Sequence, residues 1–427
     1  MYNQIKKIDA TDNNHTKIRD YVEECTELKE LHFSHNNLTV IPDFIGKLIK
    51  LEFINVGANI LTTLPDSIGN LINLKVLYAN SNKLTVLPDS IGNLINLERL
   101  DIADNQVVEL PESIGNLKKL KRFILNNNRI VELPESIGNL TNLKKLNVNN
   151  NRIVDLPESI GDLTNLEVLR FSSNQIIILP ESICDLVNLT EITLENNQII
   201  ELPENIGNLT NLQHLIASNY PYNSHLTTLP DSIGNLTNLK TLHFGNHKLT
   251  VIPDSIGNLT KLEYLYLCDN KITVIPDSIG NLINLKELDL SGNFLTELPD
   301  SIGNLINVKE LHLRNNNLRE LPDSFCNLLQ LDELTIRSNS IRKYPHDMLR
   351  ILYNDSRDVD LSIDVFISDN SINKELPPYK RESIVNIVSK IAEKGTEKSA
   401  ENPKYVFPTD ISEHIAGFFG SRKKVKI

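Results

Sequence analysis

Four side chains near the middle of the sequence are of types that bind transition metals. They are His214, His243, Cys268 and Asp269. Imidazole, thiolate and carboxylate groups are the usual ligands of zinc in proteins. Their spacing matches no metal-binding motif, however, and histidines that face solvent are usually without a metal. The sequence therefore predicts no metal site.

Motifs of the common enzyme classes are absent from the sequence. It contains no GxxxxGKS/T phosphate loop, no GxGxxG after a strand, no HExxH, no HRD with DFG, and no GxSxG. Cys184-Asp185 and Cys268-Asp269 are adjacent pairs, so they do not form the CxD triplet of bacterial repeat-bearing ubiquitin ligases. We therefore expect a protein that is not an enzyme and that needs no cofactor.

The charge balance argues against two classes of partner. The 427 residues carry a formal net charge of −12, whereas surfaces that bind nucleic acids or anionic membranes need an excess of basic residues. No apolar run approaches the roughly 18 residues that span a bilayer. The N-terminal residues also lack the apolar core of a secretory signal. We expect no nucleic acid and no membrane as partners.

The cysteines favour a reducing compartment. Cys25, Cys184, Cys268 and Cys326 are scattered singly, with neither CxxC spacing nor a disulfide framework. Cys184 and Cys326 fit the role of small, buried apolar side chains. Together with the missing secretory signal, this usage predicts a cytoplasmic protein.

A fixed period dominates the chain. Prolines recur every 23 residues in two runs, and the interval between the runs is 27 residues, which marks a four-residue insertion. The first run is Pro42, Pro65, Pro88, Pro111, Pro134, Pro157, Pro180 and Pro203, and the second is Pro230, Pro253, Pro276, Pro299, Pro322 and Pro345. Self-similarity at such a period is typical of solenoids, which grow by stacking one unit on the next.

One unit, residues 143–157, shows what the repeat builds. Its sequence LKKLNVNNNRIVDLP alternates around Leu146 and Val148, so a short strand should point these two side chains inward and their polar neighbours outward. Asn151 recurs in most units, and its amide can bond backbone groups that a turning chain leaves inside the coil. The proline, acidic residue and glycine of the next segment favour a short helical turn. The units therefore predict a parallel sheet with one buried face and one solvent face.

The form LPxSIGNLxNLxxLxLxxN resembles the 23-residue class of intracellular leucine-rich repeats, and it is similar to Ras-pathway scaffold proteins and plant Ras-group-related repeat proteins. The resemblance implies an α/β fold: a leucine-rich repeat solenoid, curved as a horseshoe, with a parallel concave β-sheet and short helical or 3-10 turns on the convex side. It also implies a monomeric signalling scaffold that binds a protein, such as a small GTPase or a signalling enzyme, on the concave sheet.

The period predicts fourteen strands. Their centres are Leu31, Ile54, Leu77, Leu100, Phe123, Leu146, Leu169, Ile192, Leu215, Leu242, Leu265, Leu288, Leu311 and Leu334. We expect an N-terminal cap at 1–27, a repeat array at 28–345, a C-terminal cap with a strand and a helix at 346–400, and a linker, short amphipathic helix and basic tail at 401–427. Within the first cap, Ile18, Val22 and Cys25 have the spacing of a small helix.

Side chains on either side of each strand centre should face solvent on the concave sheet, where their types form zones. An apolar patch consists of Phe53, Val76 and Tyr78. A basic stripe consists of Arg99, Arg122, Lys145 and Arg170, and an acidic end consists of Glu287, Asp289, Glu310 and Glu333. Between the last two lie His214, Ile216, His243, Tyr264 and Tyr266. Exposed aromatic residues are typical of interface hot spots, and surrounding charge sets orientation and association rate.

The insertion lies beside this central zone, in residues 218–225. A loop that interrupts a regular array often carries function. We therefore expect a protein partner to be anchored by Tyr220, Tyr222, His243, Tyr264 and Tyr266. Two alternatives remain: the loop is tolerated variation with hydrated tyrosines, or the whole array is purely structural.

The C-terminal residues depart from the period. Residues 359–367 alternate as a strand, and residues 384–391 have the apolar spacing of a helix. The segment FPTDISEHIAGFF at 407–419 is similar to the opening helix of F-box and pox-type ankyrin C-terminal motifs. That resemblance implies a ubiquitin-ligase substrate receptor whose Skp-type adaptor contacts Pro408, Ile411, Ile415 and Phe418. The alternative is a helix that docks on the C-terminal cap.

Overall fold

The computed structural model describes residues 2–220, 225–342 and Pro345. The chain divides into two compact units, Met1–Asn370 and Ser371–Ile427, and all described residues belong to the first. The strand predicted at 359–367 and the helix predicted at 384–391 lie outside the described residues. So do the F-box-like residues Pro408, Ile411, Ile415 and Phe418.

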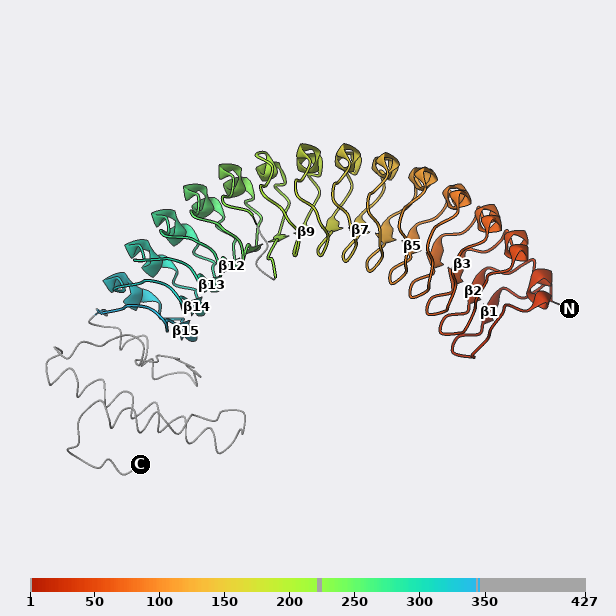
Figure 1. The fold of residues 1–427 in the computed structure, drawn as a ribbon, viewed down its shortest axis with the longest axis horizontal. Helices are drawn as coiled ribbons and strands as arrows, with labels where there is room; N and C mark the ends of the chain where they lie inside the picture. Colours follow the sequence, from red (N-terminus) through yellow and green to blue (C-terminus); the bar gives the residue numbers. More distant parts are fainter. Residues whose placement is uncertain (1, 221–224, 343–344, 346–427) are drawn as a thin grey trace, which may run out of the picture. The chain divides into compact units, whose positions relative to one another are not determined.

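Within the described residues, fifteen three-residue strands form one sheet in which every strand pairs in parallel with its sequence neighbours (Figure 1). The strands are β1 (Lys7–Asp9), β2 (Glu30–His32), β3 (Phe53–Asn55), β4 (Val76–Tyr78), β5 (Arg99–Asp101), β6 (Arg122–Ile124), β7 (Lys145–Asn147), β8 (Val168–Arg170), β9 (Glu191–Thr193), β10 (His214–Ile216), β11 (Thr241–His243), β12 (Tyr264–Tyr266), β13 (Glu287–Asp289), β14 (Glu310–His312) and β15 (Glu333–Thr335). The sheet lines the concave side of this unit, as expected for a leucine-rich repeat solenoid.

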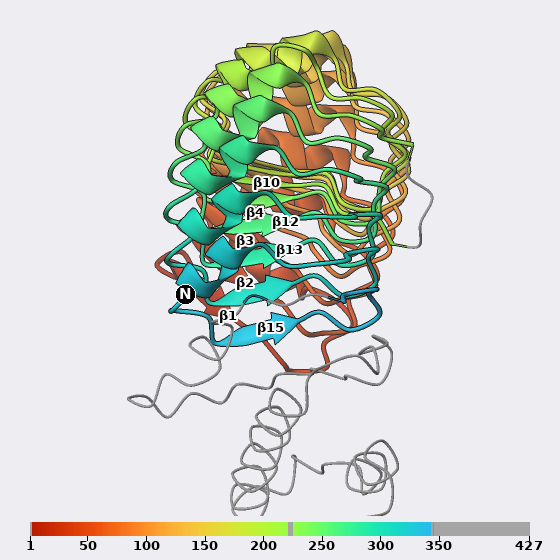
Figure 2. The ribbon, with the colours of Figure 1, turned by 90° about the vertical axis from the view of Figure 1, so that its left-hand side faces the viewer.

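Short 3-10 helices cross the convex side and stack in a continuous row (Figure 2). They are η1 (Asp20–Glu24), η2 (Asp43–Lys47), η3 (Asp66–Asn70), η4 (Asp89–Asn93), η5 (Glu112–Asn116), η6 (Glu135–Asn139), η7 (Glu158–Asp162), η8 (Glu181–Asp185), η9 (Ile206–Asn208), η10 (Asp231–Asn235), η11 (Asp254–Asn258), η12 (Asp277–Asn281), η13 (Asp300–Asn304) and η14 (Asp323–Asn327). None of these helices is both long and apolar enough to cross a membrane.

The repeated proline starts most of these helices. Pro157 has a φ of −67° and a ψ of 148°, and its carbonyl accepts the backbone N–H of Ile160 at 3.0 Å. The pyrrolidine ring fixes φ near the value that the helix start requires, and it removes an N–H that the short helix would leave without a partner. The residue type therefore sets where each convex turn begins.

The strand centres point into the core as predicted. Leu146 and Leu169 pair in register and are fully buried. All fourteen predicted centres lie in strands β2–β15, and each is at most 1% exposed. Burial of one such side chain contributes roughly 2 kcal/mol, so the recurrent leucines supply the main stabilisation of the array.

The sheet begins one strand earlier than the sequence analysis predicted. β1 pairs with β2, with Lys7 opposite Glu30. The unit around β1 has the repeat pattern at Ile5, Ile8, Ala10 and Asn13. Arg19 occupies the place where the other units have proline. Because the period was measured from the prolines, this unit was not counted, and the prediction of fourteen strands was one too few.

The predicted small helix in the N-terminal cap is a 3-10 helix rather than an α-helix. η1 occupies the position that η2 has in the next unit, and Ile18, Val22 and Cys25 are buried as their spacing suggested. Residues 2–27 thus have the architecture of a further repeat. Their role as a cap stays a prediction.

One buried asparagine in each regular unit ties the chain together. The Nδ2 of Asn151 lies 2.9 Å from the carbonyl of Val148, 3.2 Å from that of Asn149 and 3.1 Å from that of Leu125 in the preceding unit. Its Oδ1 accepts the N–H of Ile130 at 3.0 Å. We call the series of such residues the asparagine ladder. It satisfies backbone groups inside the coil, as the sequence suggested.

The ladder changes where the insertion falls. Asn219 lies one residue before the ladder position, and its Oδ1 accepts the N–H of Asn197 at 3.0 Å, whereas Asn197 Oδ1 accepts the regular bond from Ile176. In the next unit a histidine replaces the asparagine. His247 Nε2 donates to the carbonyl of Ala217 at 2.5 Å, which corresponds to the bond that Asn151 makes to Leu125. The regular pattern resumes at Asn270.

A second asparagine explains the NLxN sequence that precedes the strands. Asn142 Nδ2 donates to the carbonyl of Lys118 at 2.8 Å, and Asn165 donates to the carbonyl of Thr141 at 2.8 Å. These side chains are exposed, so each bond joins neighbouring units at the surface rather than in the core.

The repeated glycine allows neighbouring 3-10 helices to approach closely. A Cβ atom at Gly115 would lie 2.5 Å from the carbonyl oxygen of Ser136 and 2.7 Å from its Cβ. No side chain fits there. Serine and glycine therefore recur together because the serine of one helix packs on the glycine of the helix before it.

Candidate protein-binding face

The solvent face of the sheet carries the two columns of side chains that flank the strand centres. In β7, Leu146 is buried while Lys145 and Asn147 are half-buried. The same pattern holds in nearly every strand. Thr193 departs from it, since it is only 7% exposed. The predicted columns therefore line the concave face, with Thr193 removed from the accessible set.

An aromatic patch forms at the N-terminal part of this face. The rings of Phe53 and Tyr78 meet edge to face with centroids 5.6 Å apart, next to Val76. His32 adds a ring that stacks on Phe53 at 4.6 Å. The sequence analysis placed Phe53, Val76 and Tyr78 together but did not include His32. His32 directly follows the strand centre Leu31, so its place in the same column as Tyr78 was a sequence signal for this contact.

Three basic residues lie in register on consecutive strands. Arg99 pairs opposite Arg122, and Arg122 pairs opposite Lys145. None of the ion pairs between described residues involves these three side chains, which we call the basic ladder. Burial and the charges of Arg170 and Arg122 hold the pKa of Lys145 below its usual value. The basic ladder thus offers three positive side chains that form no direct ion pair with another described residue.

Arg170, unlike the residues of the basic ladder, forms an ion pair. Its Nε lies 2.6 Å from Glu191 Oε1 and its second guanidinium nitrogen lies 3.1 Å from Glu191 Oε2. This bidentate pair raises the pKa of Arg170. Glu191 on the neighbouring strand therefore balances the charge of Arg170, and the part of Arg170 in partner binding stays a prediction.

The central zone contains a group of rings, His243, Tyr264 and Tyr266, which we call the aromatic cluster. The rings of His243 and Tyr266 are 5.0 Å apart, and those of Tyr264 and Tyr266 are stacked at 6.4 Å. Burial lowers the pKa of His243. Burial and the hydrogen bond that Tyr266 donates to Glu287 at 2.7 Å raise the pKa of Tyr266. The imidazole of His243 and the hydroxyl of Tyr266 are therefore neutral at physiological pH, and the ring contacts hold the cluster in place.

The remaining central residues are placed as follows. His214 Nδ1 lies 3.1 Å from Thr241 Oγ1, and Ile216 is half-buried beside His243 in register. Tyr220 is 75% exposed, and its backbone N–H is held by Asn196 Oδ1 at 2.7 Å. Tyr222 lies outside the described residues. Of the five predicted anchor residues, the structure brings three together in the aromatic cluster.

The four metal-ligand types from the centre of the sequence do not converge on one point. Burial raises the pKa of the Cys268 thiol to about 12 and also raises the pKa of Asp269. Among the described residues, the group whose ligand atoms do converge is Glu287, Glu310 and His312.

A third column lines the concave face, three residues after each strand centre. Glu195 belongs to it, and its two carboxylate oxygens accept bonds from Ser218 at 3.3 Å and Ser172 at 3.4 Å. Asn126 belongs to it as well and accepts a bond from Asn147 at 3.2 Å. Sequence reasoning missed this column because it considered only the immediate neighbours of each centre.

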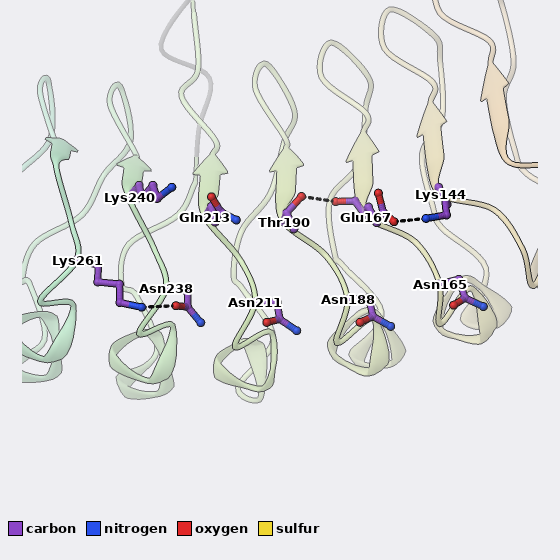
Figure 3. A pocket seen from close by; sticks show the side chains of 10 residues that line it. All are labelled: Lys144, Asn165, Glu167, Asn188, Thr190, Asn211, Gln213, Asn238, Lys240 and Lys261. Carbon is purple, nitrogen blue, oxygen red and sulfur yellow. Dashed lines mark hydrogen bonds and ion pairs between the residues drawn. The ribbon is translucent and has the colours of Figure 1, made fainter.

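A polar groove of about 640 Å³ runs along the flank of the array, at the N-terminal ends of strands β7–β11 (Figure 3). Glu167 accepts a bond from Lys144 at 2.6 Å, and Lys261 donates to Asn238 at 2.7 Å. Thr190 donates to the Glu167 carbonyl at 2.9 Å. The groove is lined by polar side chains, and several of them bond to groups in the neighbouring repeat.

Comparisons with known proteins agree with this geometry. The family described as leucine-rich repeat region matches residues 5–105, 99–174, 135–222 and 220–293. A second family, described as leucine rich repeat, matches residues 283–341. No curated protein matches the chain.

Solved structures with the same architecture include proteins from several organisms. A leucine-rich repeat protein of Leptospira interrogans is 32% identical, with a TM-score of 0.70 over 82% of this chain and 93% of that one. The plant peptide hormone receptor RGFR1, in complex with RGF2, is 32% identical, with a TM-score of 0.68 over 77% of this chain and 54% of the receptor. An internalin of Listeria monocytogenes is 24% identical, with a TM-score of 0.60 over 80% and 87%, and it shares the fold. The family matches span more than half of the chain, and the chain therefore belongs to the leucine-rich repeat family.

Proposed function

We propose that the protein is a non-catalytic scaffold that binds a protein partner on the concave face of its sheet. The observation that carries this proposal is the aromatic cluster, whose three half-buried rings are fixed by contacts with one another and by Glu287. Rigid aromatic side chains bury a large area at a small cost in conformational entropy, and they dominate the energetics of interfaces.

The charges of the face define one property of the partner. The basic ladder of Arg99, Arg122 and Lys145 takes part in none of the ion pairs between described residues. An acidic segment of a partner would supply a counter-charge and would steer the encounter. We therefore propose a partner that places an acidic segment on β5–β7 and apolar or aromatic residues on β11 and β12.

The cellular setting follows as part of the same proposal. Cys25, Cys184 and Cys268 are free thiols in separate repeats, which supports a reducing compartment and hence the cytoplasm. We propose a monomer, and the resemblance to intracellular scaffolds makes a small GTPase or a signalling enzyme the partner class to test first.

A photo-crosslinking experiment tests the binding face. We would place p-benzoylphenylalanine at Tyr264 in the full chain, and at Ile95, a 55% exposed residue beside the 3-10 helices, as the control. Irradiation in cells should capture a partner from position 264 and not from position 95. Tyr264→Ala with Tyr266→Ala should weaken binding of that partner at least about tenfold, with an unchanged circular dichroism spectrum. Equal capture from both positions, or equal binding by the double variant, would reject the concave site.

A second candidate function rests on the F-box-like segment at 407–419, with Pro408, Ile411, Ile415 and Phe418 as the proposed contacts of a Skp-type adaptor. Binding of purified adaptor to the full chain, compared with a chain that ends at residue 406, tests it directly. The adaptor role requires micromolar binding that is lost on truncation while concave binding persists. Equal binding by both chains, or none, removes this candidate.

A further inference from the structure

His312 lies among carboxylates on the C-terminal part of the concave face. Its Nε2 is 3.9 Å from Glu287 Oε1 and 3.8 Å from Glu310 Oε2. Both distances exceed the length of a hydrogen bond. The nitrogen and the two carboxylates converge with all three ligand atoms within 4.8 Å of one another, and no direct bond joins the histidine to either carboxylate.

An identical tripeptide elsewhere in the chain behaves differently. Strand β2 and strand β14 both read Glu-Leu-His. In β2, His32 Nε2 lies 3.2 Å from Glu30 Oε2, at hydrogen-bond distance. The residues opposite Glu30 are Lys7 and Phe53, and the carboxylate next to His32 on the neighbouring strand is Asp9, which lies in the other column. The separated arrangement at β14 is therefore a property of its neighbours and not of the tripeptide.

Two polar contacts hold the ligand atoms in this arrangement. Thr335 Oγ1 lies 3.2 Å from His312 Nδ1, which leaves Nε2 directed toward the carboxylates. The hydroxyl of Tyr266 donates to Glu287 Oε2 at 2.7 Å, which leaves Oε1 facing His312. Metal-binding histidines and carboxylates usually have their second polar atom engaged in this way.

The carboxylates in this column lie opposite one another, so a bound cation would stabilise them. Glu287 pairs in register opposite Glu310, and Glu310 pairs opposite Glu333, which we call the acidic ladder. Like charges directly opposite on neighbouring strands are destabilising. None of the Lys or Arg ion pairs between described residues involves Glu287, Glu310 or Glu333. His312 supplies the nitrogen ligand that the structure places beside Glu287 and Glu310.

We propose that Glu287, Glu310 and His312 bind a divalent transition-metal ion, with zinc as the probe. One imidazole nitrogen and two carboxylate oxygens are ligands that Zn²⁺ accepts, whereas Ca²⁺ and Mg²⁺ prefer oxygen alone. The side chains of His312 and Glu287 are 18% and 22% exposed. The ion would therefore keep at least one coordination position open toward the concave face. This inference does not rest on the proposed protein partner.

Sequence analysis did not find this site because its three residues come from two units. Glu287 precedes Glu310 by one full period, and the short-range spacings that identify metal motifs do not apply across stacked strands. The fold brings the residues together through the register of β13 and β14.

Titration calorimetry on the full chain tests the proposal. The chain is first treated with EDTA and dialysed, and ZnCl₂ is then added at pH 7.5. We expect the His312→Ala and Glu287→Gln variants to lose affinity for one zinc ion by more than about tenfold, and Thr335→Val to lose about tenfold. The matched control is His32→Ala, which removes the histidine of the identical tripeptide in β2 and should bind zinc as the original chain does.

Two further measurements make the outcome decisive. Cobalt(II) bound to the original chain should give visible absorption bands that are absent in His312→Ala. Circular dichroism shows that each variant is folded. The proposal is overturned if His312→Ala and the original chain bind zinc equally, which would place any zinc elsewhere. It is also overturned if no zinc binds to the original chain.

Discussion

The buried side-chain amides of the asparagine ladder connect neighbouring units of the array. The four contacts of Asn151 connect its own turn to the unit before it. Three of these contacts are buried and the fourth, to the carbonyl of Asn149, is partly buried, so the side chain supplies hydrogen bonds to backbone groups that are largely shielded from water. Asparagine suits the position because one short side chain carries both a donor and an acceptor.

Truncation of a side chain in the asparagine ladder should destabilise the protein strongly. Asn151→Ala leaves the N–H of Ile130 and the carbonyls of Leu125 and Val148 without this partner, and it should lower the free energy of unfolding by about 3 to 5 kcal/mol. Asn142→Ala in the same unit removes one exposed bond to Lys118 and should cost less than about 1 kcal/mol. Urea denaturation of both variants measures the difference. Equal losses would show that burial of the amide is not what matters.

At the scale of an element, the contact between neighbouring 3-10 helices sets how closely the units stack on the convex side. Gly115 and Ser136 illustrate it, because the carbonyl oxygen of the serine occupies the space that a side chain would need. Any β-carbon at Gly115 must push the next helix away. The strands, 23 residues apart in sequence, would then no longer keep their register.

Gly115→Ala tests this packing. The added methyl group would overlap Ser136, so we expect a loss of about 1 to 3 kcal/mol in unfolding free energy. The neighbouring exposed residue provides a control: Asn116→Ala should change stability by less than about 0.5 kcal/mol. Thermal denaturation of the two variants distinguishes them. An unaffected Gly115→Ala variant would mean that the helices have room to move apart.

The sequence predicted the elements well and their side-chain pairings poorly. Strand centres such as Leu146 follow from a period that the chain repeats many times, so each unit supports the assignment of the others. β1 was missed because its unit has Arg19 in place of proline. Arg170 was assigned as open charge because nothing in a single unit shows that Glu191 lies beside it. Contacts between units depend on register, which only the stacked fold provides.

For the whole molecule, the junction at the insertion is the place where regular stacking is interrupted. A narrow packing defect lies there, lined in part by Leu194, Ala217, Phe244 and His247. Burial lowers the pKa of His247 to about 4 from an ordinary value of 6.5. The stability of the junction therefore depends on a group that must stay neutral.

Acid should weaken the array through this residue. The unfolded chain takes up a proton on His247 near pH 6.5, whereas the folded chain resists it down to about pH 4. The contribution of neutral His247 to the free energy of unfolding is therefore complete above pH 6.5. This contribution is lost as the pH falls toward 4, with roughly 2 kcal/mol lost by pH 5. Melting curves between pH 8 and 5 for the original chain and His247→Asn measure this.

The asparagine variant restores the ladder residue of the other units and removes the titrating group. It should show a shallower fall in melting temperature on acidification than the original chain does. Parallel curves for the two proteins would assign the acid sensitivity to other groups.

The uniform contact between adjacent units has a consequence for design and for evolution. Because Asn, Gly and Ser meet the same partners at nearly every interface, one copy of the 23-residue motif can be duplicated or deleted without creating a new type of junction. A duplication or deletion between β7 and β11 would change the distance between the basic ladder and the aromatic cluster by one strand spacing, about 4.8 Å. The number of repeats between the two groups thus sets the distance between them, and this distance can change without any change in the residues that form either group.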